Sequence, residues 1–232
     1  MDALYVLGNS SQYNNLELRL SLRSLEQNAK DLESVFIVGE KPDWIKNVVH
    51  IPVDDVYTRE NNVFRKILTA CKLDISENFL FMNDDFYMMK PFIMEDYPYF
   101  VNGEVVCISK PSLYQMVQNK TLNELQSKGI ERVMDYRVHS PIVFNKEKFL
   151  TLEGYYKSTK LERVGYSPRM LYGNFFVDNY IQADDCKLWA NDKIKATKQG
   201  CISTNDDCED ILKELLEIFN KPSKYEKGEL NG

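Results

Sequence analysis

Strands and helices alternate over the first part of this chain, and that alternation limits the folds open to it. Short apolar runs at residues 4–7, 35–38 and 79–82 have the length and composition of buried strands. A leucine stripe at i, i+4 and i+7, which begins at Leu18, predicts a helix between the first two runs. Asn62 is expected to cap the helix that precedes the third run. The pattern predicts a single-domain α/β fold whose mixed, mostly parallel sheet is flanked by helices.

The second half of the chain is less regular. Residues 105–108 are expected to form a strand, and residues 210–219 have the apolar spacing of a helix. Residues 165–182, rich in Gly, Tyr, Phe and Asn, are expected to be ordered but irregular. We expect one domain over residues 1–220, followed by a polar tail over residues 221–232 that frays.

Composition excludes several classes of protein. With 44% hydrophobic residues, the 232-residue chain can bury a substantial core. A net charge of −6 argues against a nucleic-acid-binding protein, and no apolar run approaches the ~20 residues that span a bilayer. The start of the chain lacks the basic segment of a signal peptide, and the five cysteines form no CxxC pair. We therefore expect a cytoplasmic protein, in contact at most with the inner face of a membrane.

The run at 79–82 ends in Asn83, Asp84 and Asp85, which form the first candidate site. Parallel α/β sheets present functional groups at the carboxyl ends of their strands. Two adjacent carboxylates repel each other, so they are tolerated when a cation lies between them or when water reaches both. Oxygen ligands favour Mg²⁺ or Mn²⁺, and such an ion could bridge the phosphates of a nucleotide-sugar. The alternative is a solvated turn at the end of the strand.

Two arginines form the second candidate. Arg19 and Arg23 are four residues apart and share one face of the predicted helix. Paired guanidinium groups suit the recognition of phosphate or carboxylate. The alternative is a solvated surface on which they pair with Glu17 and Glu26.

Three further candidates lie in the second half. His139 stands among polar groups before a proline, and imidazole suits proton transfer near neutral pH, although a lone histidine is more often structural. Arg169 begins a turn-prone segment that could bind an acceptor or a nucleotide, or serve only as a structural loop. Asn205, with Asp206 and Asp207, precedes the last helix as a second amide–carboxylate group or as its cap.

Taken together, these stretches resemble the conserved regions of the Stealth family of sugar-1-phosphate transferases. The second region of that family resembles residues 17–24, 35–44 and 81–86, the third resembles the segment around His139, and the fourth resembles residues 201–207. The first region has a Trp-Val-Asp-Gly core, whereas this chain has a turn containing Asn9. The resemblance covers most of residues 15–92 and only islands afterwards.

The resemblance implies a glycosyltransferase-A-like fold that binds a nucleotide-sugar. Asp84 and Asp85 would then stand at the metal-binding acidic motif, with Mg²⁺ or Mn²⁺ as cofactor, and Asp84 and His139 would be the catalytic residues. The expected nucleotide- or substrate-binding residues are Asn9, Arg19, Arg23, Asn83, Arg169 and Asn205.

The predicted function is the metal-dependent transfer of a sugar from a nucleotide-sugar donor to a glycan or lipid-linked glycan acceptor. A close alternative is Stealth-like transfer of sugar-1-phosphate in capsule or surface polysaccharide synthesis. An alternative of another class is a non-catalytic carbohydrate-binding domain.

Overall fold

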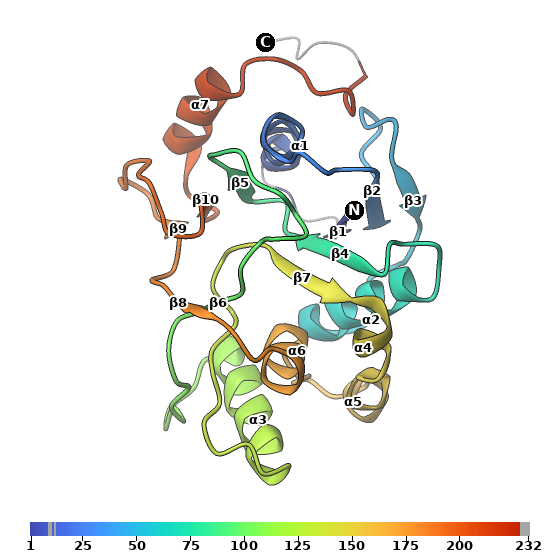
Figure 1. The fold of residues 1–232 in the computed structure, drawn as a ribbon, viewed down its shortest axis with the longest axis vertical. Helices are drawn as coiled ribbons and strands as arrows, with labels where there is room; N and C mark the ends of the chain where they lie inside the picture. Colours follow the sequence, from blue (N-terminus) through green and yellow to red (C-terminus); the bar gives the residue numbers. More distant parts are fainter. Residues whose placement is uncertain (9–10, 12, 228–232) are drawn as a thin grey trace.

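The computed structural model, which describes residues 1–8, 11 and 13–227, is built around a five-stranded sheet in the order β3-β2-β1-β4-β7 (Figure 1). The strands are β1 (Asp2–Leu7), β2 (Val35–Gly39), β3 (Val49–Ile51), β4 (Asn78–Met82) and β7 (Ile142–Asn145). The first four are parallel, and β7 is antiparallel to β4. The prediction of a mixed, mostly parallel sheet is confirmed.

Helices cover both faces of the sheet (Figure 1), and the central strands β1 and β4 are apolar after their first residues, Asp2 and Asn78. On β1, Leu4 packs into the core under α2, whereas Ala3 and Tyr5 pack into the core under α1. The same alternation on β4 sends Phe81 to the first core and Leu80 to the second. The covering helices are α1 (Leu16–Asn28) on one face and α2 (Arg59–Cys71), α4 (Lys146–Leu150) and α6 (Pro168–Phe176) on the other, and α5 (Glu153–Thr159) packs against α2 farther from the sheet.

The strand that follows β4 in the chain belongs to a second, smaller sheet. It consists of β5 (Phe86–Met88), β10 (Cys201–Thr204) and β9 (Lys187–Leu188), in the order β5-β10-β9. The other side of β5 is bonded to side chains of α1: Ser21 Oγ donates to the Phe86 carbonyl at 2.6 Å, and Asn28 Nδ2 donates to the Met88 carbonyl at 2.8 Å. The Met88 amide donates to Ser24 Oγ at 2.9 Å. The strand that follows the β4–β5 turn is therefore fixed against α1 at both of its ends.

Two predicted elements of the second half are wrong. Residues 165–182 contain α6, which begins with Ser167 as N-cap and Pro168 in its first turn. The serine Oγ accepts a bond from the Met170 amide at 3.3 Å, so a standard start signal was overlooked. Residues 105–108 form no strand; β6 (Phe100–Val101) instead pairs with β8 (Ile181–Gln182).

The start of α2 also differs from its prediction. Thr58 precedes the helix, and Asn62 lies in the first turn rather than at the cap. The Asn62 side chain binds the loop before the helix instead: its Oδ1 accepts from the Tyr57 amide at 3.0 Å, and its Nδ2 donates to the Tyr57 carbonyl at 2.7 Å. An asparagine amide can bond local backbone without capping a helix.

The end of the described chain packs onto α1 and does not fray. The remaining helices are α3 (Leu113–Ser127) and α7 (Glu209–Ile218). In the segment after α7, Tyr225 and Glu226 are only 1% and 3% exposed. Glu226 accepts bonds from Arg23 at 2.8 Å, so the expectation of a frayed tail is wrong for residues 221–227. Residues 228–232 lie outside the described part, and a domain boundary at residue 220 stays a prediction.

Within residues 1–8, 11 and 13–227, no helix has both the length and the apolar character needed to cross a membrane. The predicted cytoplasmic location stays a prediction.

Two helical glycines make a matched test of core packing. A Cβ on Gly173 of α6 would overlap ring atoms of Tyr136, whereas a Cβ on Gly154 of α5 would meet none of the described residues within 4 Å. We expect Gly173→Ala to lower the free energy of unfolding by about 1–3 kcal/mol through overpacking. Gly154→Ala should raise it by about 0.4–1 kcal/mol, because alanine loses less backbone entropy. Urea unfolding measures both, and a Gly173→Ala variant as stable as the parent would contradict the packing of α6.

Candidate active site

A cleft of about 650 Å³ opens at the carboxyl ends of β1 and β4. The chain leaves β1 for β2 and returns to β4 on the other side of β1, so the cleft lies where the strand order reverses. Open α/β sheets bind their ligands at this point. The lining residues are Val6, Gly8, Ser11, Glu17, Asp55, Arg59, Asn62, Val63, Lys66, Asn83, Asp84, Asp85, Lys187, Thr204, Asn205 and Asp206.

Carboxylates dominate one side of the cleft. Asp84 is half-buried, and burial, then the neighbouring Asp85, then Glu17 raise its pKa to about 7. Burial also raises the pKa of Glu17, with Asp85 and Asp206 adding to the effect. The carboxylates of the cleft therefore disfavour one another's ionisation, and a bound cation would reduce this repulsion.

Asp85 is held rigidly but is not fully satisfied. Its Oδ2 accepts from Ser203 Oγ on β10 at 2.8 Å and lies 3.9 Å from Lys187 Nζ on β9. Its Oδ1 is buried and has no hydrogen-bond partner among the described residues. A buried, partnerless carboxylate oxygen is costly unless a ligand completes it, so the geometry suits a divalent cation.

The protein supplies only part of such a cation site. Among the residues that the structure describes, no three His, Cys, Asp or Glu side chains gather closely enough to hold a metal. Mg²⁺ sites are often made of one or two carboxylates together with substrate phosphates and water. Asp84 and Asp85 fit that kind of site, in which the substrate provides the remaining ligands.

Cationic side chains line the same cleft, mainly from α2. Arg59, Asn62, Val63 and Lys66 follow one another at i, i+3, i+4 and i+7, so one face of α2 borders the cleft. The charge of Arg59 acts on Asp84 and lowers its pKa slightly against the larger raising effects. Lys66 is buried; its Nζ pairs with Asp55 at 2.5 Å and donates to the Leu7 carbonyl at 2.6 Å. This basic face was missed in the sequence, although its helical spacing is visible there.

Four of the predicted site residues meet in this cleft. Asn83, Asp84 and Asp85 line it from the β4–β5 turn, and Asn205 lines it from the end of β10. The backbone N–H of Asn205 donates to the Leu188 carbonyl at 2.9 Å, so the backbone of Asn205 is held beside β9. Asn9, which was predicted to bind the nucleotide or substrate, lies outside the described residues.

The arginine pair of α1 lies elsewhere. Arg23 donates to both carboxylate oxygens of Glu226 at 2.8 Å, and Arg19 donates to the same group at 3.0 Å. Arg19 also stacks on Trp44, with its guanidinium carbon 3.9 Å from the ring centroid. The structure does not bring this pair to the cleft, and it uses their charge to hold the end of the chain on α1.

His139 lies outside the lining of the cleft but is connected to it. Its Nδ1 bonds to Asp185 Oδ2 at 2.7 Å, and its amide donates to Asp185 Oδ1 at 3.2 Å. Burial raises the pKa of Asp185, but the bonds from His139 outweigh it and hold that pKa below its usual value. Lys187, two residues after Asp185, reaches Asp85. No sequence pattern pointed to Asp185, which is 46 residues from its partner.

Arg169 lies beside the β4–β5 turn rather than in the cleft. Its guanidinium carbon is 5.9 Å from the ring centroid of Phe81 and 5.8 Å from that of Phe86. It donates to the Ser140 carbonyl, its Nε has no partner among the described residues, and burial lowers its pKa. The segment is a helix start and not the predicted turn, and Arg169 supports the residues that flank the aspartates.

Comparison with known proteins identifies the fold. No protein-family model and no curated protein matches the chain. The galactosyltransferase LgtC, solved in complex with donor and acceptor sugar analogs, aligns with a TM-score of 0.54 over 97% of this chain and 98% of its own, at 9% identity. An active-site mutant of LgtC aligns with a TM-score of 0.52 at 9% identity over the same shares of the two chains. The chain therefore has the α/β fold of glycosyltransferase-A-like enzymes, and the resemblance to the Stealth family stays a hypothesis.

Proposed function

We propose that this protein is a metal-dependent glycosyltransferase that takes its sugar from a nucleotide-sugar. The observation that carries the proposal is the cleft at the switch point, which is lined both by two adjacent carboxylates and by basic residues of α2. A nucleoside diphosphate is anionic, so it needs both a cation on the acidic side and direct basic contacts on the other. LgtC, which has the same fold, is a galactosyltransferase solved with donor and acceptor sugar analogs.

Named residues divide the work of binding the donor. Asp84 and Asp85 would hold the cation, and the Oδ1 of Asp85, which has no partner among the described residues, would be available for it. Arg59 of α2 contacts the phosphates, Lys66 lines the cleft while it pairs with Asp55, and Lys187 holds Asp85 in place. When bound, Mg²⁺ or Mn²⁺ would neutralise the charge that builds up on the departing diphosphate. Asn83 and Asn205 supply amide groups that orient the donor in the cleft.

His139 takes the proton of the acceptor hydroxyl in this proposal. Asp185 engages its Nδ1, which leaves Nε2 as the ring nitrogen that can accept a proton. Asp185 is a positioning residue, because it acts on the substrate only through the imidazole. The acceptor is a glycan, free or linked to a lipid.

Changing this pair should affect turnover more than donor binding. We expect His139→Gln to lower kcat by about 10²–10⁴-fold, the range for loss of a general base, with a small change in donor Kd. Asp185→Asn should lower kcat at least about tenfold, because Asp185 fixes the tautomer of His139. Steady-state kinetics across a pH range of about 5 to 9 measures both. Unchanged kcat in His139→Gln would remove the histidine from the reaction.

The nature of the released nucleotide tests the reaction class. The protein is incubated with Mn²⁺ and a panel of nucleotide-sugars, with water or a simple glycoside as acceptor, and the products are separated by anion exchange. A nucleoside diphosphate is the expected product, because the sugar carbon is the reacting atom. A nucleoside monophosphate would instead support the Stealth-like transfer of sugar-1-phosphate. If no nucleotide is released with either acceptor, the non-catalytic carbohydrate-binding domain becomes the better account.

A further inference from the structure

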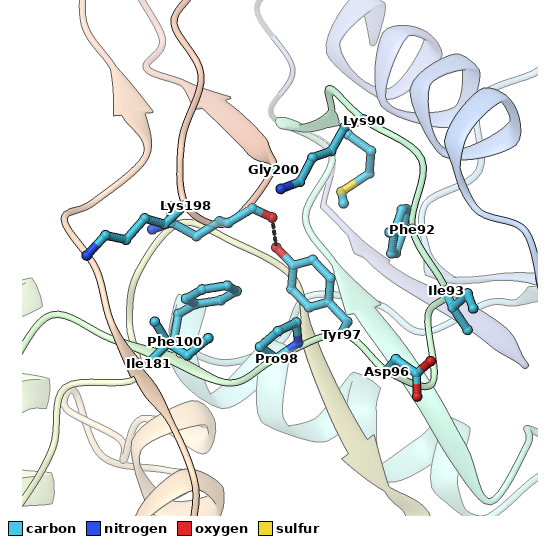
Figure 2. Close-up of a pocket in the computed structure, with 12 residues that line it drawn as sticks. Lys90, Phe92, Ile93, Asp96, Tyr97, Pro98, Phe100, Ile181, Lys198 and Gly200 are labelled. Atoms are coloured by element: carbon cyan, nitrogen blue, oxygen red, sulfur yellow. Dashed lines mark hydrogen bonds between the residues drawn. The ribbon is translucent and has the colours of Figure 1, made fainter.

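A second cavity, of about 270 Å³, lies at the other end of the β5–β10 pair (Figure 2). It shares no lining residue with the acidic cleft. Strand β10 leads from Gly200, at this cavity, to Thr204, at the cleft. The lining residues are Met88, Lys90, Phe92, Ile93, Asp96, Tyr97, Pro98, Phe100, Ile181, Lys198, Gln199 and Gly200.

The walls of this cavity are mainly apolar. Tyr97 and Phe100 form buried parts of the wall, and Ile93 and Ile181 are each 45% exposed. The Tyr97 hydroxyl donates to the Gln199 carbonyl at 2.9 Å (Figure 2), so its polar group is satisfied and its ring offers apolar surface. A concave apolar surface left open to water is typical of a ligand site.

Two lysines give this cavity a positive charge. Neither Lys90 nor Lys198 forms an ion pair with a carboxylate anywhere in the described ranges, and Asp96 is not paired with either of them. Lys198 Nζ donates to the Gln182 carbonyl at 3.3 Å, which uses one of its three donors. In Figure 2, Asp96 lies at the end of the cavity beside Ile93, away from the ammonium groups.

The stem of Lys90 packs against the backbone of Gly200. Its φ of +68° lies in the left-handed region that favours glycine, and a Cβ there would overlap Cε of Lys90. The stem of Lys90 therefore lies across the backbone of Gly200, in space that only glycine leaves free. This contact places the stem of Lys90 beside the cavity, as Figure 2 shows.

We propose that this cavity binds an amphiphile composed of a phosphate group and a hydrocarbon chain. Lys90 contacts the phosphate, Lys198, whose ammonium group lies farther out in Figure 2, adds positive charge at the rim, and the aliphatic and aromatic walls take the first carbons of the hydrocarbon chain. Charged sugars fit less well, because Ile93, Pro98 and Ile181 offer no side-chain hydrogen bonds to hydroxyl groups. The site does not depend on the proposed function, since it uses none of the residues of the acidic cleft.

Calorimetry with three probes tests this site in the intact protein. The probes are octyl phosphate below its micellar concentration, inorganic phosphate, and octyl glucoside, which has the same chain on a neutral head. We expect octyl phosphate to bind at least about tenfold more tightly than either of the others, because only it uses both the lysines and the walls. If inorganic phosphate binds as tightly as octyl phosphate, the hydrocarbon chain of the ligand has no role in binding. If octyl glucoside binds as tightly as octyl phosphate, the phosphate group has no role.

Variants locate the binding. The double variant Lys90→Ala/Lys198→Ala should lower the affinity for octyl phosphate at least about tenfold. Ile181→Asp, which adds a negative charge to the apolar rim, should lower it to the same degree. Lys157→Ala, which removes an exposed lysine of α5, is the matched control and should leave the affinity unchanged. Circular dichroism checks that each variant is folded. If the double variant binds octyl phosphate as the parent does, the cavity is not the site.

Discussion

Asp85→Asn is expected to lower nucleotide-sugar turnover at least about a hundredfold and to weaken Mn²⁺ binding to a similar degree. The change keeps the shape of the side chain and the oxygen that accepts from Ser203. It removes the charge from Oδ1, the buried atom that has no partner in the described structure. Kinetics gives the loss of turnover, and the electron paramagnetic resonance of free Mn²⁺ gives the loss of metal binding.

The same variant should be no less stable than the parent. Burial raises the pKa of Asp84 most and the neighbouring Asp85 raises it further, so neutralising Asp85 relieves a repulsion between the two groups. Asp74→Asn is the matched control. Asp74 is exposed and precedes the amino end of β4, whereas Asp85 follows its carboxyl end. It should leave turnover and Mn²⁺ affinity as they are. An Asp85→Asn protein that binds Mn²⁺ and turns over normally would show that the metal lies elsewhere.

Arg23→Met is expected to lower the free energy of unfolding by about 3–5 kcal/mol, because it leaves the buried carboxylate of Glu226 without its main partner. Arg23 and Glu226 are 5% and 3% exposed and are joined by bonds of 2.8 Å. Arg23 also donates to the Phe219 carbonyl at 2.9 Å, so its loss affects the end of α7 as well. Urea unfolding followed by circular dichroism at neutral pH measures the change.

The double variant Arg23→Met/Glu226→Met separates charge from packing. It should recover most of the lost stability, because neither charge then remains buried. Lys213→Met is the control for an ordinary ion pair: it breaks the exposed contacts with Glu209 and Asp210 and should leave the unfolding midpoint unchanged. A small effect of Arg23→Met, below about 1 kcal/mol, would contradict the packing of residues 221–227 on α1.

Acid should remove the same contribution from the parent protein. Burial raises the pKa of Glu226, but the bonds from Arg23 and the Ser223 amide outweigh it and hold the pKa below the ordinary value of 4.5. A carboxylate with a lowered folded-state pKa stabilises the fold above its unfolded pKa, and this stability is lost as the pH falls through the folded-state value. The stability difference between the parent and Glu226→Gln, measured by urea unfolding, should therefore shrink below pH 4.5.

The parts of the fold that depend on local pattern were predictable from sequence. The buried runs of β1, β2 and β4, and the leucine stripe of α1, are decided by neighbouring residues, and each was predicted within a few positions. Asn83, Asp84 and Asp85 were found for the same reason, since they directly follow a buried strand. The basic face of α2 was also readable, because Arg59 and Lys66 have helical spacing, but it was not recognised.

The remaining features depend on contacts between distant parts of the chain. Glu226 is 203 residues from Arg23, so a local pattern alone suggested a phosphate site at the arginine pair. Asp185 and His139 likewise meet only through the tertiary fold. The strand predicted at residues 105–108 is wrong for a similar reason. The apolar run borders a core there but does not pair with another strand.

Titration calorimetry of a nucleoside diphosphate panel, with Mn²⁺ and with a chelator, tests the central proposal most directly. We expect at least one nucleoside diphosphate to bind in the presence of Mn²⁺, much more weakly with the chelator, and much more weakly to Asp85→Asn. Such a result would place both the cation and the diphosphate at the β4–β5 turn. If no nucleotide binds under any of these conditions, or if the parent and Asp85→Asn bind equally well, the cleft is not a nucleotide-sugar site.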